Sequence, residues 1–144
     1  MRFLVLNGPN LNLLGIREPD IYGKQSYQDL VAYIEAFAKE LNIVCDVFQS
    51  NHEGVLIDKI QEAMGKYDGI IINPAGYTHT SIAIADALKA VKIPAVEIHL
   101  SDIATREDYR KKSYTSEGCI KVIAGLGFAG YKEGATFLLQ VLAE

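Results

Sequence analysis

Three side chains that can carry out acid–base chemistry alternate along one short apolar run. Glu97, His99 and Ser101 stand within residues 96–101, between valine, isoleucine and leucine. In an extended strand, alternate side chains project to the same face, so the carboxylate and the imidazole become neighbours. A carboxylate in such a run is costly to bury unless it is paired, and the adjacent histidine is its natural partner. We predict a Glu97–His99 pair that orients the histidine as an acid, with a purely structural pair as the alternative.

A second candidate pair stands in a long polar stretch near the start of the sequence. Arg17 and Tyr22 lie within residues 7–23, a connection long enough to act as a lid. A free tyrosine ionises near pH ~10, but a guanidinium about 4 Å away contributes roughly 4 kcal/mol at an effective dielectric near 20. That field is enough to populate a phenolate, and arginine keeps its own proton throughout. A solvated arginine and a packing tyrosine explain the spacing equally well.

A third polar segment, residues 73–81, contains an amide and an imidazole that could bind a ligand. Asn73 follows an apolar run, at the place where a response-regulator receiver carries its phospho-acceptor aspartate, and an amide cannot take that role. His79 follows six residues later. The alternative is structural, with Asn73 forming a turn before Pro74 and His79 belonging to a helix cap.

Other common site chemistries have no support in the residue pattern. Cys45 and Cys119 lie inside apolar runs, where reduced buried thiols are the usual state, and no Ser-His-Asp or Cys-His arrangement is present. His52, His79 and His99 show no spacing typical of a metal site. We therefore expect neither a nucleophilic mechanism nor a metal or other cofactor, and we expect His52 to be structural.

The elements that would position these residues alternate between two periodicities. Short apolar runs rich in β-branched residues, continuous as in strands covered on both faces, predict a parallel sheet. The five predicted strands cover residues 3–6, 44–48, 69–72, 95–100 and 120–124.

Helical spacing of apolar residues separates these runs. Ser26 with Asp29 forms a capping-box signal before the first helix, and Ser50 with Glu53 opens the second. Two further helices are predicted over about residues 81–90 and 128–142.

This order predicts a three-layer, doubly wound α/β fold, flavodoxin-like with a five-stranded parallel sheet, in one catalytic domain over residues 1–144. Ligands bind such folds beyond the carboxyl ends of the strands. The polar stretches 7–23, 73–80 and 101–110 each follow a predicted strand. Residues far apart in sequence should therefore meet at one edge of the sheet.

Composition narrows the classes of partner. The chain has 18 acidic and 14 basic residues, a formal charge of -4, and no tryptophan, which disfavours nucleic acid. No run approaches the ~18 apolar residues that span a bilayer, and the apolar start at residues 1–6 is shorter than a signal-peptide core. We expect a cytoplasmic protein with reduced cysteines.

The chain resembles the type II 3-dehydroquinate dehydratases over essentially its full length. Several separate motifs occur in the family's order, which makes a chance match very improbable. They are residues 4–15, 17–19, 22–23, 49–54, 72–74, 77–81 and 96–101.

The resemblance implies reversible dehydration of 3-dehydroquinate to 3-dehydroshikimate through an enolate, in the shikimate pathway of aromatic amino acid and chorismate biosynthesis. Tyr22 would be the base that removes the C2 proton, and Arg17 would keep it ionised and stabilise the transition state. His99, oriented by Glu97, would protonate the departing C1 hydroxyl. Asn12 would position a water against the enolate oxygen.

The resemblance also implies the binding residues and the assembly. The family uses no metal and forms dodecamers built from trimers. The residues expected to bind substrate are Asn73, His79, Leu100, Ser101 and Arg110, with Asp86 reaching the site of a neighbouring subunit.

Two competing interpretations remain. A flavodoxin-like module for a nucleotide or signalling phosphate would need a phosphate loop, and both Gly-x-Gly-x-x-Gly and the Gly-Lys-Ser/Thr ending are absent from residues 7–23. Dehydration through a lysine imine belongs to a (β/α)₈ barrel of about 250 residues, longer than this chain.

Overall fold

The computed structural model describes residues 1–16 and 24–144. At its centre is one parallel sheet with the strand order β2-β1-β3-β4-β5, which is the flavodoxin-like order. The predicted fold class is therefore confirmed, and each predicted strand is present to within one residue at either end. The strands are β1 (Arg2–Asn7), β2 (Val44–Gln49), β3 (Gly69–Asn73), β4 (Ala95–His99) and β5 (Lys121–Ala124).

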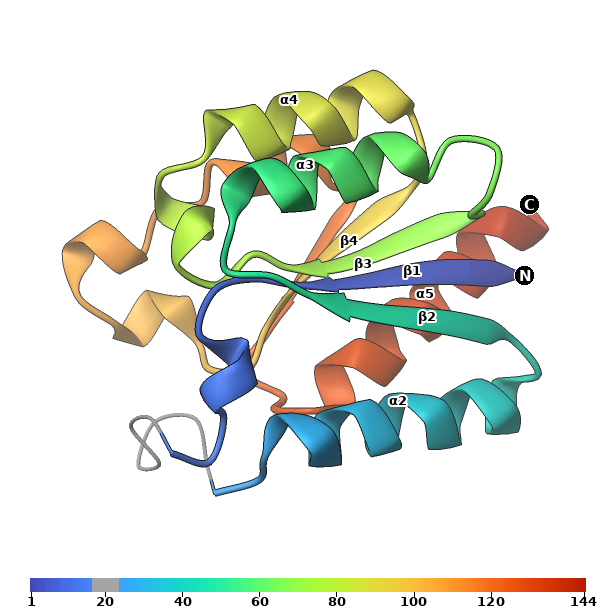
Figure 1. Cartoon of the computed structure of the whole chain (residues 1–144), viewed down its shortest axis with the longest axis horizontal. Helices are drawn as coiled ribbons and strands as arrows, with labels where there is room; N and C mark the ends of the chain where they lie inside the picture. The colour runs from blue at the N-terminus through green and yellow to red at the C-terminus, as the bar shows by residue number, and fades with distance from the viewer. Residues whose placement is uncertain (17–23) are drawn as a thin grey trace.

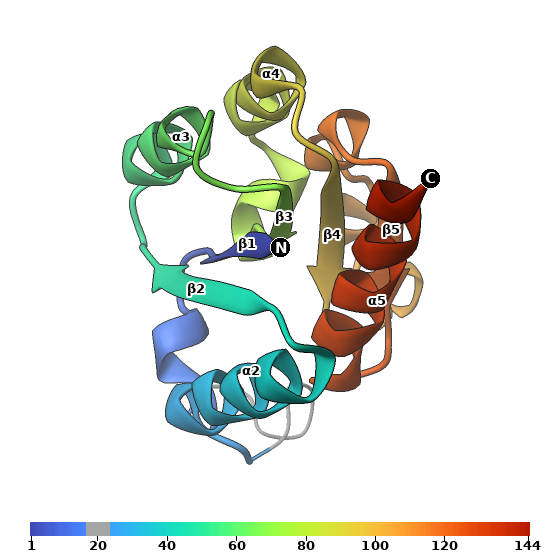
Figure 2. The same ribbon diagram turned by 90° about the vertical axis from the view of Figure 1, so that its right-hand side faces the viewer.

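Four long helices cover the two faces of the sheet, two on each face (Figures 1 and 2). Helices α2 and α5 lie on one side, and α3 and α4 on the other. None of the helices in the described part of the chain is both long and apolar enough to cross a membrane. The bounds are α2 (Tyr27–Leu41), α3 (Glu53–Glu62), α4 (Ile82–Val91) and α5 (Ala129–Ala143).

Two apolar cores, one on each face, follow from the alternation of side chains along the strands. Val96 and Ile98 of β4 pack in the core that contains Leu30 of α2 and Leu138 of α5. Ala95 and the intervening positions point to the opposite face, towards α3 and α4. Burial on both faces explains why the central strands β1, β3 and β4 are almost continuously apolar. Glu97 interrupts this pattern, with none of its surface exposed.

Helices α2 and α4 begin with a side-chain cap, whereas α3 and α5 begin without one. Ser26 accepts a hydrogen bond from the Asp29 amide at 3.1 Å, and the Asp29 side chain accepts from the Ser26 amide at 2.9 Å, so the predicted capping box is present. The prediction that Ser50 opens the second helix was wrong. Its hydroxyl accepts instead from the His52 amide at 3.0 Å, and His52 occupies the N-cap position without a side-chain cap.

Short 3₁₀ helices gather at the carboxyl ends of the strands, on the left in Figure 1. They occupy the polar stretches that the sequence places there, but their helical turns escaped prediction because turns of three to five residues have no apolar period to detect. They are η1 (Leu11–Leu13), η2 (Ala75–His79), η3 (Ile103–Thr105) and η4 (Asp108–Arg110). A fifth 3₁₀ helix, η5 (Thr115–Gly118), packs against α4 and leads into the amino end of β5.

A close backbone contact joins the ends of β1 and β3 beneath these turns. The Gly8 amide donates to the Asn73 carbonyl at 2.8 Å, and a Cβ built on Gly8 would lie 2.4 Å from the Pro74 carbonyl oxygen. Real Cβ atoms do not approach backbone so closely. Glycine at position 8 therefore allows the two loops to meet at the point where the strand order reverses.

The two cysteines lie at opposite edges of the sheet, and both are partly exposed rather than fully buried as expected. Cys45 belongs to the edge strand β2, and Cys119 lies two residues before β5, the strand at the other edge. Burial, with the neighbouring Asp46 charge second, raises the pKa of Cys45 to about 11. Burial, followed by the Glu97 charge, raises the pKa of the Cys119 thiol well above its usual range.

Gly8→Ala should destabilise the protein by roughly 1–3 kcal/mol, because the new methyl group must push two backbone segments apart. Urea unfolding followed by circular dichroism measures the change. Gly54→Ala, on the exposed start of α3 with nothing within 4 Å of the added carbon, is the matched control and should be neutral or slightly stabilising. Equal stability of the two variants would contradict the close contact.

The rate of Cys45 alkylation should keep rising with pH at values where an ordinary thiol is already fully ionised. Only the thiolate reacts, and a raised pKa means that the folded protein gains thiolate about tenfold per pH unit up to a pKa of about 11. Iodoacetamide rates in a Cys119→Ser variant isolate this group. In unfolded protein the rate should be half-maximal near pH ~8.5–9, and a half-maximal rate in that range for the folded protein would contradict the shift.

Candidate active site

A cavity of about 150 Å³ opens at the carboxyl ends of β1, β3 and β4, between the 3₁₀ turns. This is the edge that the topology assigns to ligands. Apolar side chains line it together with amide, imidazole, hydroxyl and guanidinium groups. The polar residues that line it are Asn10, Asn73, His79, His99, Ser101, Arg106 and Arg110.

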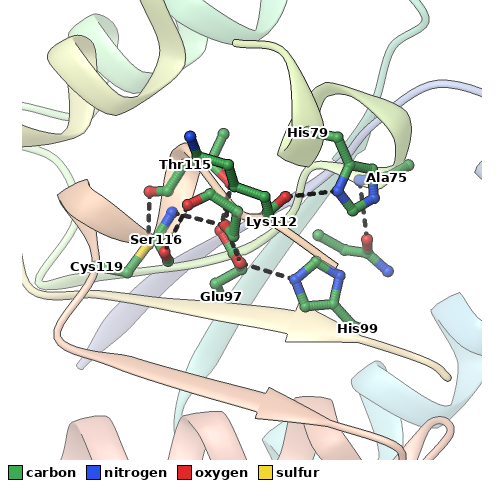
Figure 3. A network of polar contacts seen from close by, with 10 residues as sticks. Ala75, His79, Glu97, His99, Lys112, Thr115, Ser116 and Cys119 are labelled. Carbon is green, nitrogen blue, oxygen red and sulfur yellow. Dashed lines mark hydrogen bonds and ion pairs between the residues drawn. The ribbon is translucent and has the colours of Figure 1, made fainter. Parts of the chain in front are cut away.

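The predicted Glu97–His99 pair is present (Figure 3), and His99 lines the cavity with Glu97 behind it. His99 Nε2 lies 2.7 Å from Glu97 Oε2, and the exposed fractions of the two side chains are only 6% and 0%. A carboxylate oxygen accepts, so Nε2 carries the hydrogen of this bond. Nδ1 is then the nitrogen of His99 that remains to exchange a proton with a ligand in the cavity.

The second imidazole of the cavity, His79 on η2, is held in place by a backbone carbonyl. Its Nδ1 lies 2.8 Å from the Lys112 carbonyl oxygen (Figure 3). A carbonyl can only accept, so Nδ1 donates, and the neutral ring leaves Nε2 as an acceptor for a hydroxyl group. His79 and His99 therefore line the same cavity. The protein binds Nδ1 of His79 and Nε2 of His99, so the other nitrogen of each ring is left for a ligand.

Asn73, at the end of β3, is fixed by a polar cluster beneath the cavity. Its Nδ2 donates to the Tyr131 hydroxyl at 3.1 Å, and its Oδ1 accepts from the Ala75 amide at 3.1 Å. The Tyr131 hydroxyl donates in turn to Asn7 Oδ1 at 2.6 Å. Complete burial raises the pKa of the Tyr131 phenol, which therefore stays protonated and able to donate. The second Nδ2 hydrogen of Asn73 remains for a ligand.

Two arginines, Arg106 and Arg110, bring positive charge to the cavity. Arg106 Nη1 lies 3.5 Å from Ser101 Oγ, and Arg110 Nε lies 3.1 Å from a Glu107 carboxylate oxygen. Guanidinium groups beside a hydroxyl bind a carboxylate well, because their fork of donors matches its two oxygens. Leu100 and Ser101 lie just past the end of β4 and also line the cavity. The cavity can therefore bind a small anion that also carries hydroxyl groups.

Asn12 lies on η1 between lining residues and is held by a side chain from β2. Gln49 Nε2 lies 3.3 Å from Asn12 Oδ1, and also donates to the Gly8 carbonyl and to Asn51 Oδ1 at 3.1 Å each. With its oxygen engaged by Gln49, the amide of Asn12 has donors to offer. Asn12 is exposed and is not itself among the lining side chains.

The structure brings most of the predicted site residues together but not all of them. Asn73, His79, His99, Leu100, Ser101 and Arg110 line the cavity, with Glu97 behind His99. Asp86 is exposed on α4 and does not line it. Arg17 and Tyr22 lie outside the described residues, so the predicted base and its cation remain predictions.

Three residues of the site were missed by sequence reasoning. Arg106 received no role, although its spacing of four residues from Arg110 was a usable signal. Gln49 and Tyr131 contact the site across 37 and 58 residues of sequence, and no local pattern marks such contacts. Within the described ranges no group of three His, Cys, Asp or Glu side chains could hold a metal ion.

Known proteins match this chain over nearly its whole length. The family model described as "Dehydroquinase class II" matches residues 1–139. A 3-dehydroquinate dehydratase of Clostridium acetobutylicum is 51% identical over 144 residues, which is 100% of both chains. A catabolic 3-dehydroquinase of Aspergillus clavatus is 54% identical over 90% of this chain and 86% of its own.

Solved structures agree in fold as well as in sequence. The crystal structure of a type II dehydroquinase from Butyrivibrio crossotus superposes with a TM-score of 0.95 at 49% identity, and the match covers 96% of this chain and 97% of the other. A chain-long family match and this level of identity leave no other assignment: the chain belongs to the class II dehydroquinase family.

Proposed function

We propose that this chain is a type II 3-dehydroquinate dehydratase, a hydro-lyase that converts 3-dehydroquinate reversibly to 3-dehydroshikimate in the shikimate pathway. One observation carries the proposal: a relative of this name matches 100% of the chain at 51% identity. The cavity supports it, because it is lined by His99, which the buried Glu97 carboxylate orients as an acid for the elimination. Aromatic amino acid and chorismate biosynthesis would be the pathway that uses the product.

The first step removes a proton from C2 of the substrate. Tyr22, ionised by the Arg17 guanidinium, takes this proton, and the electron pair of the broken C–H bond moves to the C3 carbonyl oxygen to give an enolate. A donor near this oxygen stabilises the developing charge. Asn12, whose own oxygen is engaged by Gln49, would hold a water there through its amide hydrogens.

The second step expels the C1 hydroxyl as water. His99 donates a proton to the departing oxygen, the C1–O bond breaks, and the enolate electrons form the C1–C2 double bond. The Glu97 carboxylate, 2.7 Å from Nε2, fixes the ring and leaves Nδ1 as the proton donor. The enzyme returns to its starting state when the proton on Tyr22 passes back to His99 through solvent.

Substrate binding follows from the charges and donors of the cavity. The substrate carboxylate would bind at Leu100 and Ser101, beside the Arg106 and Arg110 guanidiniums. Its hydroxyl groups would bind the free amide hydrogen of Asn73 and the Nε2 acceptor of His79.

Assembly into a dodecamer of four trimers would complete the site. Asp86, exposed on α4 and away from its own cavity, would then reach the cavity of a neighbouring subunit. Several large apolar side chains, including Ile82 on the same helix at 59% exposure, would be covered by such contacts. A cytoplasmic location is part of the same proposal, because a soluble biosynthetic pathway operates there.

Purified protein mixed with 3-dehydroquinate should show rising ultraviolet absorbance from the conjugated enone product. Tyr22→Phe and Arg17→Ala should each lose about 10²-fold or more in kcat while folding normally, since a positioned base contributes about 10²–10⁴-fold. Tyr33→Phe is the matched control, because Tyr33 packs against Phe37 and Phe128 away from the cavity.

A flat absorbance trace from folded wild-type protein would reject the hydro-lyase and favour a nucleotide- or phosphate-binding module. Near-normal turnover in Tyr22→Phe would instead move the base to His79 or His99, both of which line the cavity.

Borohydride added during turnover should not inactivate the enzyme. Reduction traps a substrate only when it forms an imine with a lysine, and none of the cavity-lining side chains in the described ranges is a lysine. Intact-protein mass spectrometry after treatment detects any adduct. A covalent adduct on a lysine would overturn the enolate mechanism in favour of an imine route.

A further inference from the structure

Two hydroxyl groups from one loop bind the carboxylate behind His99, and the reaction described above does not use them. Ser113 Oγ donates to Glu97 Oε2 at 2.8 Å, and Thr115 Oγ1 donates to Glu97 Oε1. With the bond from His99 Nε2, both oxygens of this fully buried carboxylate have partners. Fixing both oxygens prevents the carboxylate from turning about its own axis, so its direction towards His99 is set.

The hydroxyl groups are themselves held in place by the loop. The Ser116 amide donates to Ser113 Oγ at 3.0 Å, which leaves the Ser113 hydrogen to point at Glu97. The Tyr114 amide donates to the Thr78 carbonyl at 2.8 Å, which ties the loop to η2. Thr115 has no exposed surface. The orientation of Glu97 is therefore supported by backbone contacts, and not only by side chains that could rotate.

The same loop also orients the second imidazole of the cavity. The Lys112 carbonyl accepts from His79 Nδ1, three residues before the threonine that binds Glu97. Figure 3 shows Lys112 and Thr115 on one segment, with the first turned towards His79 and the second towards Glu97. Residues 112–115 therefore hold both imidazoles in one frame, although neither Ser113 nor Thr115 lines the cavity.

We propose that Ser113 and Thr115 are positioning residues for proton transfer by His99, and that they act through Glu97. The inference rests on the proposed function, in which His99 donates the proton to the leaving hydroxyl. Loss of the Thr115 hydroxyl leaves Oε1 of the buried carboxylate without a donor, and loss of the Ser113 hydroxyl leaves Oε2 with His99 as its remaining partner. Either change lets the carboxylate reorient. The imidazole then meets the leaving group in a poorer geometry, while the surfaces that bind the substrate stay unchanged.

The test compares two substitutions at one position. Thr115→Val keeps the shape of the side chain and removes the hydroxyl, whereas Thr115→Ser keeps the hydroxyl. Thr115→Val should lower kcat roughly ten- to hundredfold with KM nearly unchanged, because a lost bond to a charged group has about that effect on a rate. Thr115→Ser should restore most of kcat. A merely structural role of the threonine would not follow the hydroxyl in this way.

A second pair of variants covers a failure of Thr115→Val to fold. Ser113→Ala removes the other hydroxyl bound to Glu97 and should lower kcat several-fold, again with little change in KM. Ser116→Ala is the matched control, since its hydroxyl binds the Ser113 carbonyl at 3.2 Å and does not touch Glu97. It should retain wild-type kcat. Thermal melts of all four variants establish that they are folded.

The outcomes separate this inference from the proposed function. Wild-type protein without dehydratase activity would overturn the proposed function and, with it, the reaction that these residues serve. Active wild-type protein with unchanged kcat in folded Thr115→Val, or in folded Ser113→Ala should Thr115→Val not fold, would overturn the positioning role alone. A rise in KM without a fall in kcat would also overturn it, because it would place the effect on substrate binding.

Discussion

A carboxylate with no exposed surface, Glu97, is the constraint on which the site depends. Burying such a charge is costly unless every oxygen finds a donor, and here the donors come from a histidine of the same strand and from two hydroxyls of a later loop. Because the carboxylate needs these donors, they fix its orientation. The carboxylate fixes which nitrogen of His99 carries a hydrogen, and so which nitrogen faces the cavity.

The parallel sheet explains why these groups meet. Its strand order reverses beside β1, and the loops that follow β1, β3 and β4 converge on that point. Gly8 permits the close contact between the segments that follow β1 and β3, and the Tyr131 hydroxyl from α5 joins the ends of these two strands through Asn7 and Asn73. Hydrogen bonds therefore join elements that are distant in sequence, and they hold the polar side chains of the site in fixed positions.

Sequence reasoning succeeded where the signal was periodic or strictly local. The strands, the capping box at Ser26 and the pairing of Glu97 with His99 depend on alternation or on neighbours a few residues apart. It failed at Ser50, whose hydroxyl satisfies a nearer amide instead of capping α3. Contacts such as those of Ser113 and Thr115 with Glu97 depend on loop geometry, which residue types alone do not encode.

The most direct test of this account is the ¹⁵N chemical shift of each ring nitrogen of His99 across a pH titration. The account predicts that Nε2 carries a hydrogen at every pH in the folded protein, held by the Glu97 carboxylate, and that only Nδ1 gains and loses a proton. A neutral ring with its hydrogen on Nδ1 and a titrating Nε2 would contradict the account, because the carboxylate would then not be orienting the histidine.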